Sequence, residues 1–215
     1  MFLPESIGGL QSLTEFNLSQ NHINYILSSV GGMKCLSLLN FDENRLEHLP
    51  KEIGGCSSLT VLALRNNWLR SIPSSIAQLR LNSTYRKTTS IVGGMKCLSL
   101  LNFDENRLEH LQKEIGGCSS LTVLTLRNNR LRSIPSSIAQ LSSLTIINII
   151  GNQLSRLPAG LSSLPHITAI WIAENQSKPL LEFQLQTDPN NGDSYFTCVV
   201  FPQQGIETPY DALII

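Results

Sequence analysis

Histidine and cysteine are the residues of this chain best suited to acid–base, nucleophilic or metal chemistry. Such chemistry needs partners at short range, such as a base beside a nucleophile or paired metal ligands in a CxxC motif. No CxxC pair, no histidine–cysteine cluster and no glycine-rich phosphate loop occurs in the sequence. The four histidines are widely spaced, at His22, His48, His110 and His166. We therefore expect a non-enzymatic protein with no catalytic residue, no metal site, no cofactor and no small-molecule substrate.

Charge and hydropathy narrow the choice of partners. The chain has 215 residues, with 16 basic and 16 acidic side chains and a formal net charge of zero. A neutral chain lacks the basic character with which proteins attract nucleic acid or anionic membranes. The N-terminus lacks the basic start and apolar stretch of a signal peptide, and no apolar run reaches the roughly 18 residues of a transmembrane helix. These features favour a cytoplasmic protein whose partners are proteins.

Asparagines mark a repeat of 23 residues along most of the chain. Around each of them recurs the pattern Leu-x-x-Leu-x-Leu-x-x-Asn-x-Leu, in which Ile or Phe can replace Leu, for example at 36–46 and 121–131. This is the signature of leucine-rich repeats. Seven asparagines hold the position: Asn21, Asn44, Asn67, Asn106, Asn129, Asn152 and Asn175.

The spacing predicts the structure of each repeat. The x-Leu-x-Leu-x segment alternates with period two, so its leucines enter the core and their neighbours face outward. Each strand pairs in parallel with the strand of the next coil, and the asparagine amide bonds backbone groups that would otherwise be buried unpaired. Pro50, Pro73, Pro135 and Pro158 begin the return along the convex side in irregular or short helical turns. We therefore predict an α/β fold, a horseshoe-shaped leucine-rich repeat solenoid with a parallel sheet on its concave face.

The cysteines fit the same frame. Cys56 and Cys118 stand where neighbouring coils have leucine, so we expect them to be small buried hydrophobic side chains. Cys35 and Cys97 repeat one another in the same way, and Cys198 lies outside the repeats. An odd number of cysteines without paired spacing predicts no disulfide framework.

Residues 30–79 and 92–141 are almost identical. Aligned at an offset of 62, they share 47 of 50 residues and differ only at Pro50/Gln112, Ala63/Thr125 and Trp68/Arg130. Such identity indicates a recent tandem duplication or an error of sequence assembly. Because 62 is two coils of 23 plus 16, segment 82–97 is predicted to be a truncated, irregular coil. We expect the amides of 82–91 to exchange quickly with solvent, and a continuous binding surface only across 98–175.

A second, smaller unit is predicted after the last asparagine of the repeat. An extended segment at 176–184, a turn-rich stretch containing Asn-Gly, and a second extended segment at 195–201 together predict a β-hairpin. A solenoid needs its last coil covered, so we expect this hairpin to be a C-terminal cap. The predicted division is a partial N-terminal coil at 1–12, repeats at 13–81, the truncated coil at 82–97, repeats at 98–175, the hairpin cap at 176–204 and a tail at 205–215.

The end of the array resembles one family of leucine-rich repeat proteins. Residues 171–180 (Trp-Ile-Ala-Glu-Asn-Gln-Ser-Lys-Pro-Leu) and 196–204 (Phe-Thr-Cys-Val-Val-Phe-Pro-Gln-Gln) are similar to the end of the repeats in LAP proteins, the group of Scribble, Lano, Erbin and Densin. Residues 51–61 are similar to Scribble and Lano in particular. The resemblance implies a cell-polarity and junction-signalling scaffold that binds cytosolic or membrane-associated proteins at the inner face of the basolateral plasma membrane.

The chain also departs from that family. It has fewer repeats, opens mid-coil at residues 3–10, and has neither a following PDZ domain nor the N-terminal cysteines that the resemblance would suggest for lipid attachment. A Ras-pathway or phosphatase-regulatory leucine-rich repeat protein shares the coil type and stays an alternative. Residues 179–204 favour the polarity scaffold, because the alternative lacks that post-repeat motif.

Binding residues are expected at the outward positions of the strands, because the curvature of a solenoid makes an extended surface there. Asp42 with Arg65, and their duplicates Asp104 with Arg127, form ladder pairs between strands or contact a partner. Trp171 packs under the hairpin or anchors an interface. The predicted partner-binding residues are Asp104, Glu105, Arg127, Asn128 and Trp171.

Overall fold

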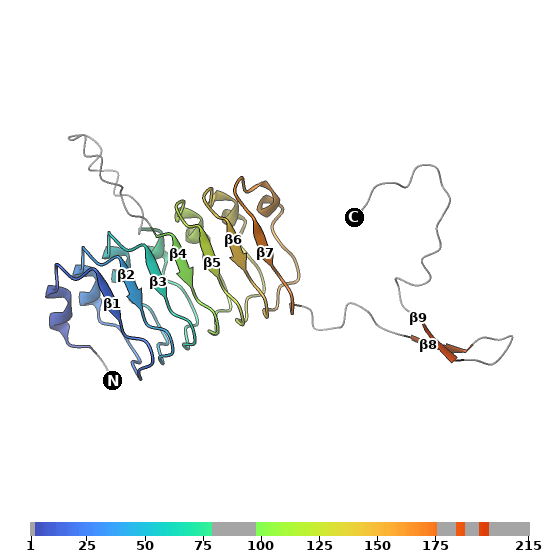
Figure 1. The fold of residues 1–215 in the computed structure, drawn as a ribbon, viewed down its shortest axis with the longest axis horizontal. Coiled ribbons are helices and arrows are strands. Elements are labelled where there is room, and N and C mark those ends of the chain that lie inside the picture. The colour runs from blue at the N-terminus through green and yellow to red at the C-terminus, as the bar shows by residue number, and fades with distance from the viewer. Residues whose placement is uncertain (1–2, 79–97, 176–183, 188–193, 198–215) are drawn as a thin grey trace. The chain divides into compact units, whose positions relative to one another are not determined.

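Seven short parallel strands form one open sheet, which confirms the predicted solenoid (Figure 1). The structure, a computed structural model, describes residues 3–78, 98–175, 184–187 and 194–197. The strands follow one another in chain order, each paired with the strand of the next coil. They are β1 (Glu15–Asn17), β2 (Leu38–Asn40), β3 (Val61–Ala63), β4 (Leu100–Asn102), β5 (Val123–Thr125), β6 (Ile146–Asn148) and β7 (Ala169–Trp171).

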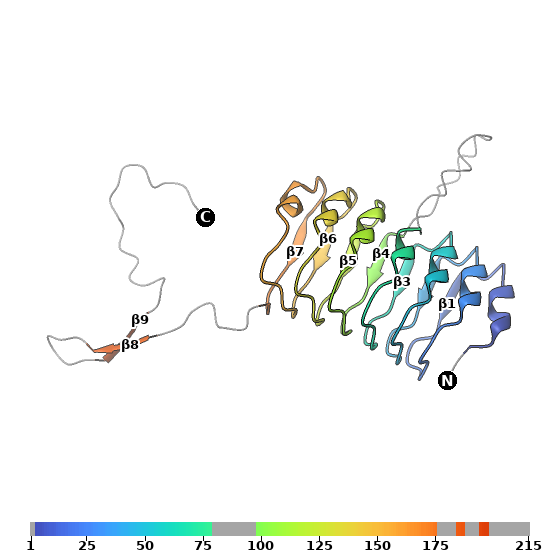
Figure 2. The same cartoon turned by 180° about the vertical axis from the view of Figure 1, so that it is seen from behind.

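Short 3₁₀ helices cover the other side of the coils, opposite the sheet (Figure 2). Pro50 precedes one of them at φ −66° and ψ 144°, and its carbonyl accepts a hydrogen bond from Ile53 N–H at 3.1 Å. Gln112 has nearly the same backbone angles, φ −67° and ψ 143°, so the replacement of Pro50 by Gln112 in the duplicate leaves this turn unchanged. The helices are η1 (Glu5–Gly9), η2 (Ser28–Gly32), η3 (Lys51–Gly55), η4 (Ser74–Gln78), η6 (Lys113–Gly117), η7 (Ser136–Gln140) and η8 (Ala159–Ser163).

The core lies between the sheet and these helices. The middle residue of β2 to β6 is always aliphatic and fully buried, as at Leu39 and Leu124. Two residues further on, the next inward position carries Phe41 and Phe103, both at 0% exposure. Each 3₁₀ helix adds one aliphatic side chain from the opposite side, such as Ile53 or Ile115. No coil buries these side chains alone, so the stability of the array comes from stacking.

The sheet continues directly from β3 to β4. Val61 lies opposite Leu100, and Leu64 N–H donates to the Asn102 carbonyl at 2.9 Å. The expectation that a continuous surface begins only at residue 98 is therefore wrong: the coil of β3 completes its return through η4, and the additional residues leave strand pairing intact. The predicted truncated coil at 82–97 lies outside the described residues. Fast amide exchange at 82–91, to be measured by hydrogen exchange, stays a prediction.

The second compact unit, Gln176–Ile215, contains a β-hairpin. Strand β8 (Gln184–Thr187) pairs antiparallel with β9 (Ser194–Thr197), with Gln184 opposite Thr197. A hairpin is thus present, but its first strand lies at 184–187, whereas the extended segment was predicted at 176–184. The second strand was predicted at 195–201 and begins at Ser194, and residues 176–183 and 198–201 lie outside the described part of the chain. The role of the hairpin as a cap on the last coil stays a prediction.

Candidate protein-interaction surface

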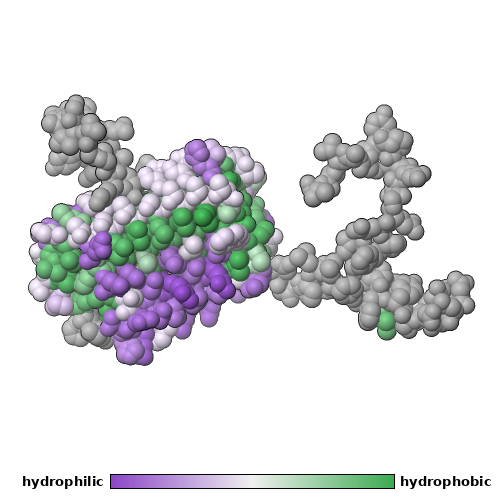
Figure 3. Space-filling model, viewed as in Figure 1, coloured by the Kyte–Doolittle hydropathy of each residue, from purple (hydrophilic) through white to green (hydrophobic). Residues whose placement is uncertain are grey.

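An apolar stripe crosses the outward face of the sheet. The first residue of each strand from β2 to β6 is aliphatic, points away from the core and is only partly buried. The strand register places these residues side by side on consecutive coils, and Figure 3 shows them as a continuous green band. We call this set the apolar stripe: Leu38, Val61, Leu100, Val123 and Ile146.

The apolar stripe was missed at the sequence level. In the sequence the aliphatic outward residues are hard to separate from the core leucines beside them, because both are apolar. The period-two rule contains the signal, because the residue directly before an inward leucine of a strand must face outward. Leu38 before Leu39 and Val123 before Leu124 both obey that rule.

A row of charged residues runs parallel to the apolar stripe, on the side where the strands end. It consists of Asp42, Arg65, Asp104 and Arg127 on four consecutive coils. Asp104 Oδ1 accepts a hydrogen bond from the backbone N–H of Arg127 at 2.7 Å, and Asp42 bonds Arg65 N–H in the same way at 2.7 Å. The carboxylates of this charged row therefore serve the backbone of the next coil, and the arginine side chains are left for other contacts.

One of these arginines forms an ion pair across the duplication junction. Arg65 Nη2 lies 3.0 Å from Glu105 Oε1, with the two side chains 50% and 32% exposed. The expected ladder pair of Arg65 with Asp42 is thus replaced by a side-chain pair with Glu105, while Asp42 contacts only the Arg65 backbone. Burial raises the pKa of Asp42 and of Asp104 and is the largest influence on both carboxyl groups. The hydrogen bonds from the backbone of the next coil lower these pKa values but do not cancel the rise.

The last residue before each ladder asparagine has a left-handed backbone. Glu105 has φ 56° and Asn128 has φ 53°, values that asparagine tolerates better than most residues. At the same place in the next coil stands Gly151, at φ 64°, where an added Cβ would lie 2.2 Å from Asn128 Oδ1. The predicted binding residues Glu105 and Asn128 are therefore held at a sharp turn at the edge of the sheet face.

Six of the seven ladder asparagines join neighbouring coils. In the buried example of Asn129, Oδ1 accepts from Leu108 N–H at 3.0 Å, and Nδ2 donates to the Phe103 carbonyl at 2.9 Å and the Leu126 carbonyl at 3.1 Å. Equivalent bonds to the preceding coil occur at Asn44, Asn67, Asn106, Asn152 and Asn175. Asn21 bonds carbonyls of its own coil, those of Leu18 and Ser19.

Trp171 lies at the end of the sheet face. Its partner in the strand register is Asn148, so it continues the third outward position of the strands, and it is 50% exposed. Its neighbours Ile170, in the middle of β7, and Ile172, directly after that strand, are 38% and 47% exposed. An interface role for Trp171 stays a prediction.

The described cysteines differ sharply in their surroundings. Cys56 and Cys118 are buried, as expected, whereas Cys35 is exposed. Burial raises the pKa of the Cys56 thiol to about 11, and Lys34 opposes the rise only weakly. Its Sγ contacts the Val30 carbonyl at 3.3 Å.

This difference predicts selective alkylation. Only the thiolate reacts quickly, so at pH 8 iodoacetamide should modify Cys35 in the folded protein and spare Cys56. Mass spectrometry of tryptic peptides measures both sites, and unfolding in guanidinium should make them equally reactive. Rapid labelling of Cys56 without denaturant would contradict the packing described for it.

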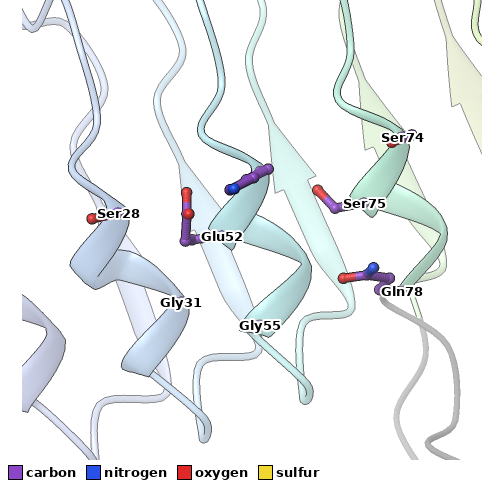
Figure 4. Close-up of a pocket in the computed structure, with 8 residues that line it drawn as sticks. Ser28, Gly31, Glu52, Gly55, Ser74, Ser75 and Gln78 are labelled. Atoms are coloured by element: carbon purple, nitrogen blue, oxygen red, sulfur yellow. The ribbon is translucent and has the colours of Figure 1, made fainter.

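A shallow groove of about 470 Å³ lies on the helix side (Figure 4). Its lining comes from η2, η3 and η4 and includes Lys51, Glu52, Ser75 and Gln78. The Ser75 hydroxyl is buried and has no hydrogen-bond partner in the described part of the chain. These side chains contain no nucleophile–base pair.

Two segments match family models of repeat proteins. Residues 119–176 match the model described as "Leucine rich repeat", and residues 58–79 match a second model with the same description. Together with the seven paired coils, these matches decide the architecture. The fold is a leucine-rich repeat solenoid. Leucine-rich repeat domains generally mediate protein–protein interaction and are typically non-catalytic.

Solved structures share the solenoid. A leucine-rich repeat protein of Leptospira interrogans is 35% identical with a TM-score of 0.71, over 80% of this chain and 40% of the other. An internalin of Listeria monocytogenes is 23% identical with a TM-score of 0.65, and the match covers 80% of this chain and 44% of the internalin. A TDR receptor is 25% identical with a TM-score of 0.56, and the match covers 80% of this chain and 32% of the receptor. The chain thus spans less than half of each, and no curated protein matches it.

Within the described ranges, no helix has the length and apolar character needed to cross a membrane. The same residues contain no group of three or more His, Cys, Asp or Glu side chains placed to share a metal ion.

Proposed function

We propose that the sheet face of the solenoid binds a protein partner, with the apolar stripe as the contact centre and the charged row as its polar rim. The single observation that carries this proposal is an outward-facing row of aliphatic side chains that is continuous over β2 to β6. Aliphatic residues on the solvent side of a strand add nothing to the core of their own coil. A contiguous apolar patch with a polar rim marks an interaction site.

The chemistry of this face suits a protein better than other ligands. Protein interfaces combine an apolar centre with hydrogen-bonding and charged groups at the edge. Here Arg127 and Asn128 are exposed on the same coil as Val123, and the charges along the row alternate in sign. A polyanion such as nucleic acid would meet Asp42 and Asp104 as well as the arginines. A small molecule would need an enclosed cavity, which an open strand face does not offer.

We also propose a narrower role, as an adaptor of the Scribble or Lano type in cell-polarity and junction signalling. It rests on the similarity of residues 171–180 and 196–204 to the post-repeat motif of LAP proteins. That role would place the protein in the cytoplasm at the inner face of the basolateral membrane. Its partners would then be cytosolic or membrane-associated proteins.

A photo-crosslinking amino acid placed at Val123 tests the binding face. The side chain is outward and partly buried, so replacement leaves the core intact. We expect discrete protein adducts after irradiation in an epithelial-cell lysate, and no such adducts from the matched position Ala139 on the helix side, which is exposed on η7. Adducts that include junction proteins would support the narrower adaptor role.

Charge reversal supplies a second test on the same face. Arg127→Glu should abolish those adducts and leave the circular dichroism spectrum unchanged, because the Arg127 side chain is exposed and only its backbone bonds Asp104. Lys113→Glu on η6 reverses a charge on the opposite side and should change neither measurement. Equal adducts from wild type and Arg127→Glu would contradict the assignment and direct attention to the C-terminal hairpin.

A further inference from the structure

The loops that leave the sheet after each ladder asparagine lie side by side and form one flank of the solenoid. Arg130 N–H donates to the Leu108 carbonyl at 2.9 Å, and Arg107 N–H donates to the Leu69 carbonyl at 2.9 Å. The same bond joins Trp68 to Leu46 and Gln153 to Leu131. Residues at one distance after the asparagine therefore stand about 5 Å apart on adjacent coils.

Arginine gathers on this flank. Six arginines lie one, three or four residues after a ladder asparagine, and only Glu47 and Glu109 share those positions as acidic residues. The described lysines are on or beside the helices of the opposite side. Although the chain has zero net charge, the fold gives this flank a formal excess of four positive charges, six arginines against two glutamates. We call these residues the arginine flank: Arg45, Arg70, Arg107, Arg130, Arg132 and Arg156.

Within the described residues, no arginine of the arginine flank forms an ion pair. The ion pair found in the described ranges joins Arg65 to Glu105, on the sheet face. On the flank, Arg107 lies over the ring of Trp68 at 5.0 Å, which is a contact with an aromatic ring and not with an anion. Arg107 and Arg130 stand at the same position of adjacent coils, where like charges repel. An anionic ligand would remove that repulsion.

We propose that the arginine flank binds an acidic segment of a partner protein. Guanidinium groups pair with carboxylates through two parallel hydrogen bonds, and arginine beside tryptophan is typical of protein interfaces. Glu109 stands between Arg70 and Arg132 along the coils. A segment with spaced acidic side chains avoids Glu109, whereas a nucleic acid or an anionic membrane presents charge without interruption. This site is distinct from the sheet face, and neither depends on the other.

The duplication itself supplies a matched variant. Trp68 and Arg130 occupy equivalent positions in two nearly identical segments. We therefore expect the fold to accept tryptophan at position 130 and arginine at position 68. Arg130→Trp should fold normally and weaken binding of a fluorescent peptide whose glutamates are separated by glycine and serine, measured by anisotropy at low salt, about threefold to fivefold. Trp68→Arg places a cation between Arg45 and Arg107 and should strengthen binding by a similar factor.

A double variant gives the larger effect. Arg130→Gln with Arg132→Gln removes two exposed charges and should weaken peptide binding about tenfold or more. Lys34→Gln with Lys113→Gln removes the same charge on the helix side and should leave the affinity unchanged. Equal losses from both double variants, or no peptide binding by the wild type at low salt, would overturn the proposal.

Two further probes separate the kinds of partner. Oligothymidylate and phosphatidylserine vesicles are titrated against the same full-length chain under the same salt conditions. We expect both to bind more weakly than the peptide, because their charge is continuous across Glu47 and Glu109. If either probe bound more tightly than the peptide, and the Arg130→Gln with Arg132→Gln variant lost that binding, the ligand of the arginine flank would be nucleic acid or membrane. That result would overturn the assignment to an acidic protein segment.

Discussion

Replacing Gly116 with alanine should destabilise the solenoid by about 3 kcal/mol. Gly116 lies on η6, against the helix of the next coil, and an added Cβ would stand 2.4 Å from the Ser137 carbonyl oxygen. That oxygen belongs to the backbone and cannot move without displacing η7. Coils that cannot approach on the helix side also lose contact in the core. Chemical denaturation followed by circular dichroism measures the effect as a lower midpoint.

Gly9→Ala is the matched control on η1. No atom lies within 4 Å of the Cβ that it would add. The same substitution in the same kind of helix should therefore leave the midpoint unchanged or raise it slightly, because alanine narrows the unfolded ensemble. If Gly116→Ala were as stable as Gly9→Ala, close stacking of the 3₁₀ helices would not limit the distance between coils.

Removing the Asn129 amide should cost about 1–3 kcal/mol, the usual penalty for leaving buried polar groups without partners. Asn129→Ala strips the Leu108 N–H of its acceptor and the Phe103 carbonyl of a donor, both in the preceding coil. Asn129 is 7% exposed, so water does not readily replace the amide. The free energy of unfolding from urea titration measures the loss.

Asn21→Ala provides the contrast within the same ladder. Asn21 is partly buried, and its described bonds go to carbonyls of its own coil. We expect Asn21→Ala to lower the free energy of unfolding by less than half as much as Asn129→Ala, because it leaves no N–H of a preceding coil without an acceptor. Equal losses at both positions would show that the amide matters for the turn within a coil and not for joining coils.

The repeat period predicts most of the fold. Inward leucines at period two, a turn at each asparagine and a return beginning at proline all follow from sequence spacing, and the strands lie where that spacing puts them. Counting residues could not show what happens between β3 and β4. An offset of 62 fits a short coil in the stack and also an insertion outside it. Only the pairing of Val61 with Leu100 decides for a continuous sheet.

The candidate surfaces are predicted less completely. Asp104, Arg127 and Trp171 lie on the sheet face as outward positions should, but the partner of a charge cannot be read from spacing. Arg65 pairs with Glu105 across the junction because the side chain of Asp42 is occupied by a backbone N–H. The arginine flank is invisible in the net charge, since acidic residues elsewhere balance it. Its arginines become neighbours only when the coils stack.

The central claim is that one sheet face runs unbroken through the duplication, and a thiol cross-link between β3 and β4 tests it most directly. In Ala63→Cys with Asn102→Cys the two thiols stand on adjacent strands, about 5 Å apart, and dibromobimane should bridge them with strong fluorescence. Ala63→Cys with Thr125→Cys places the thiols two strands apart, about 10 Å, and should give none. Mass spectrometry of the bridged peptide excludes contributions from the native cysteines. A bridged 63–102 product supports the continuous face, and its absence from a folded protein would place a further coil between β3 and β4 and contradict the account.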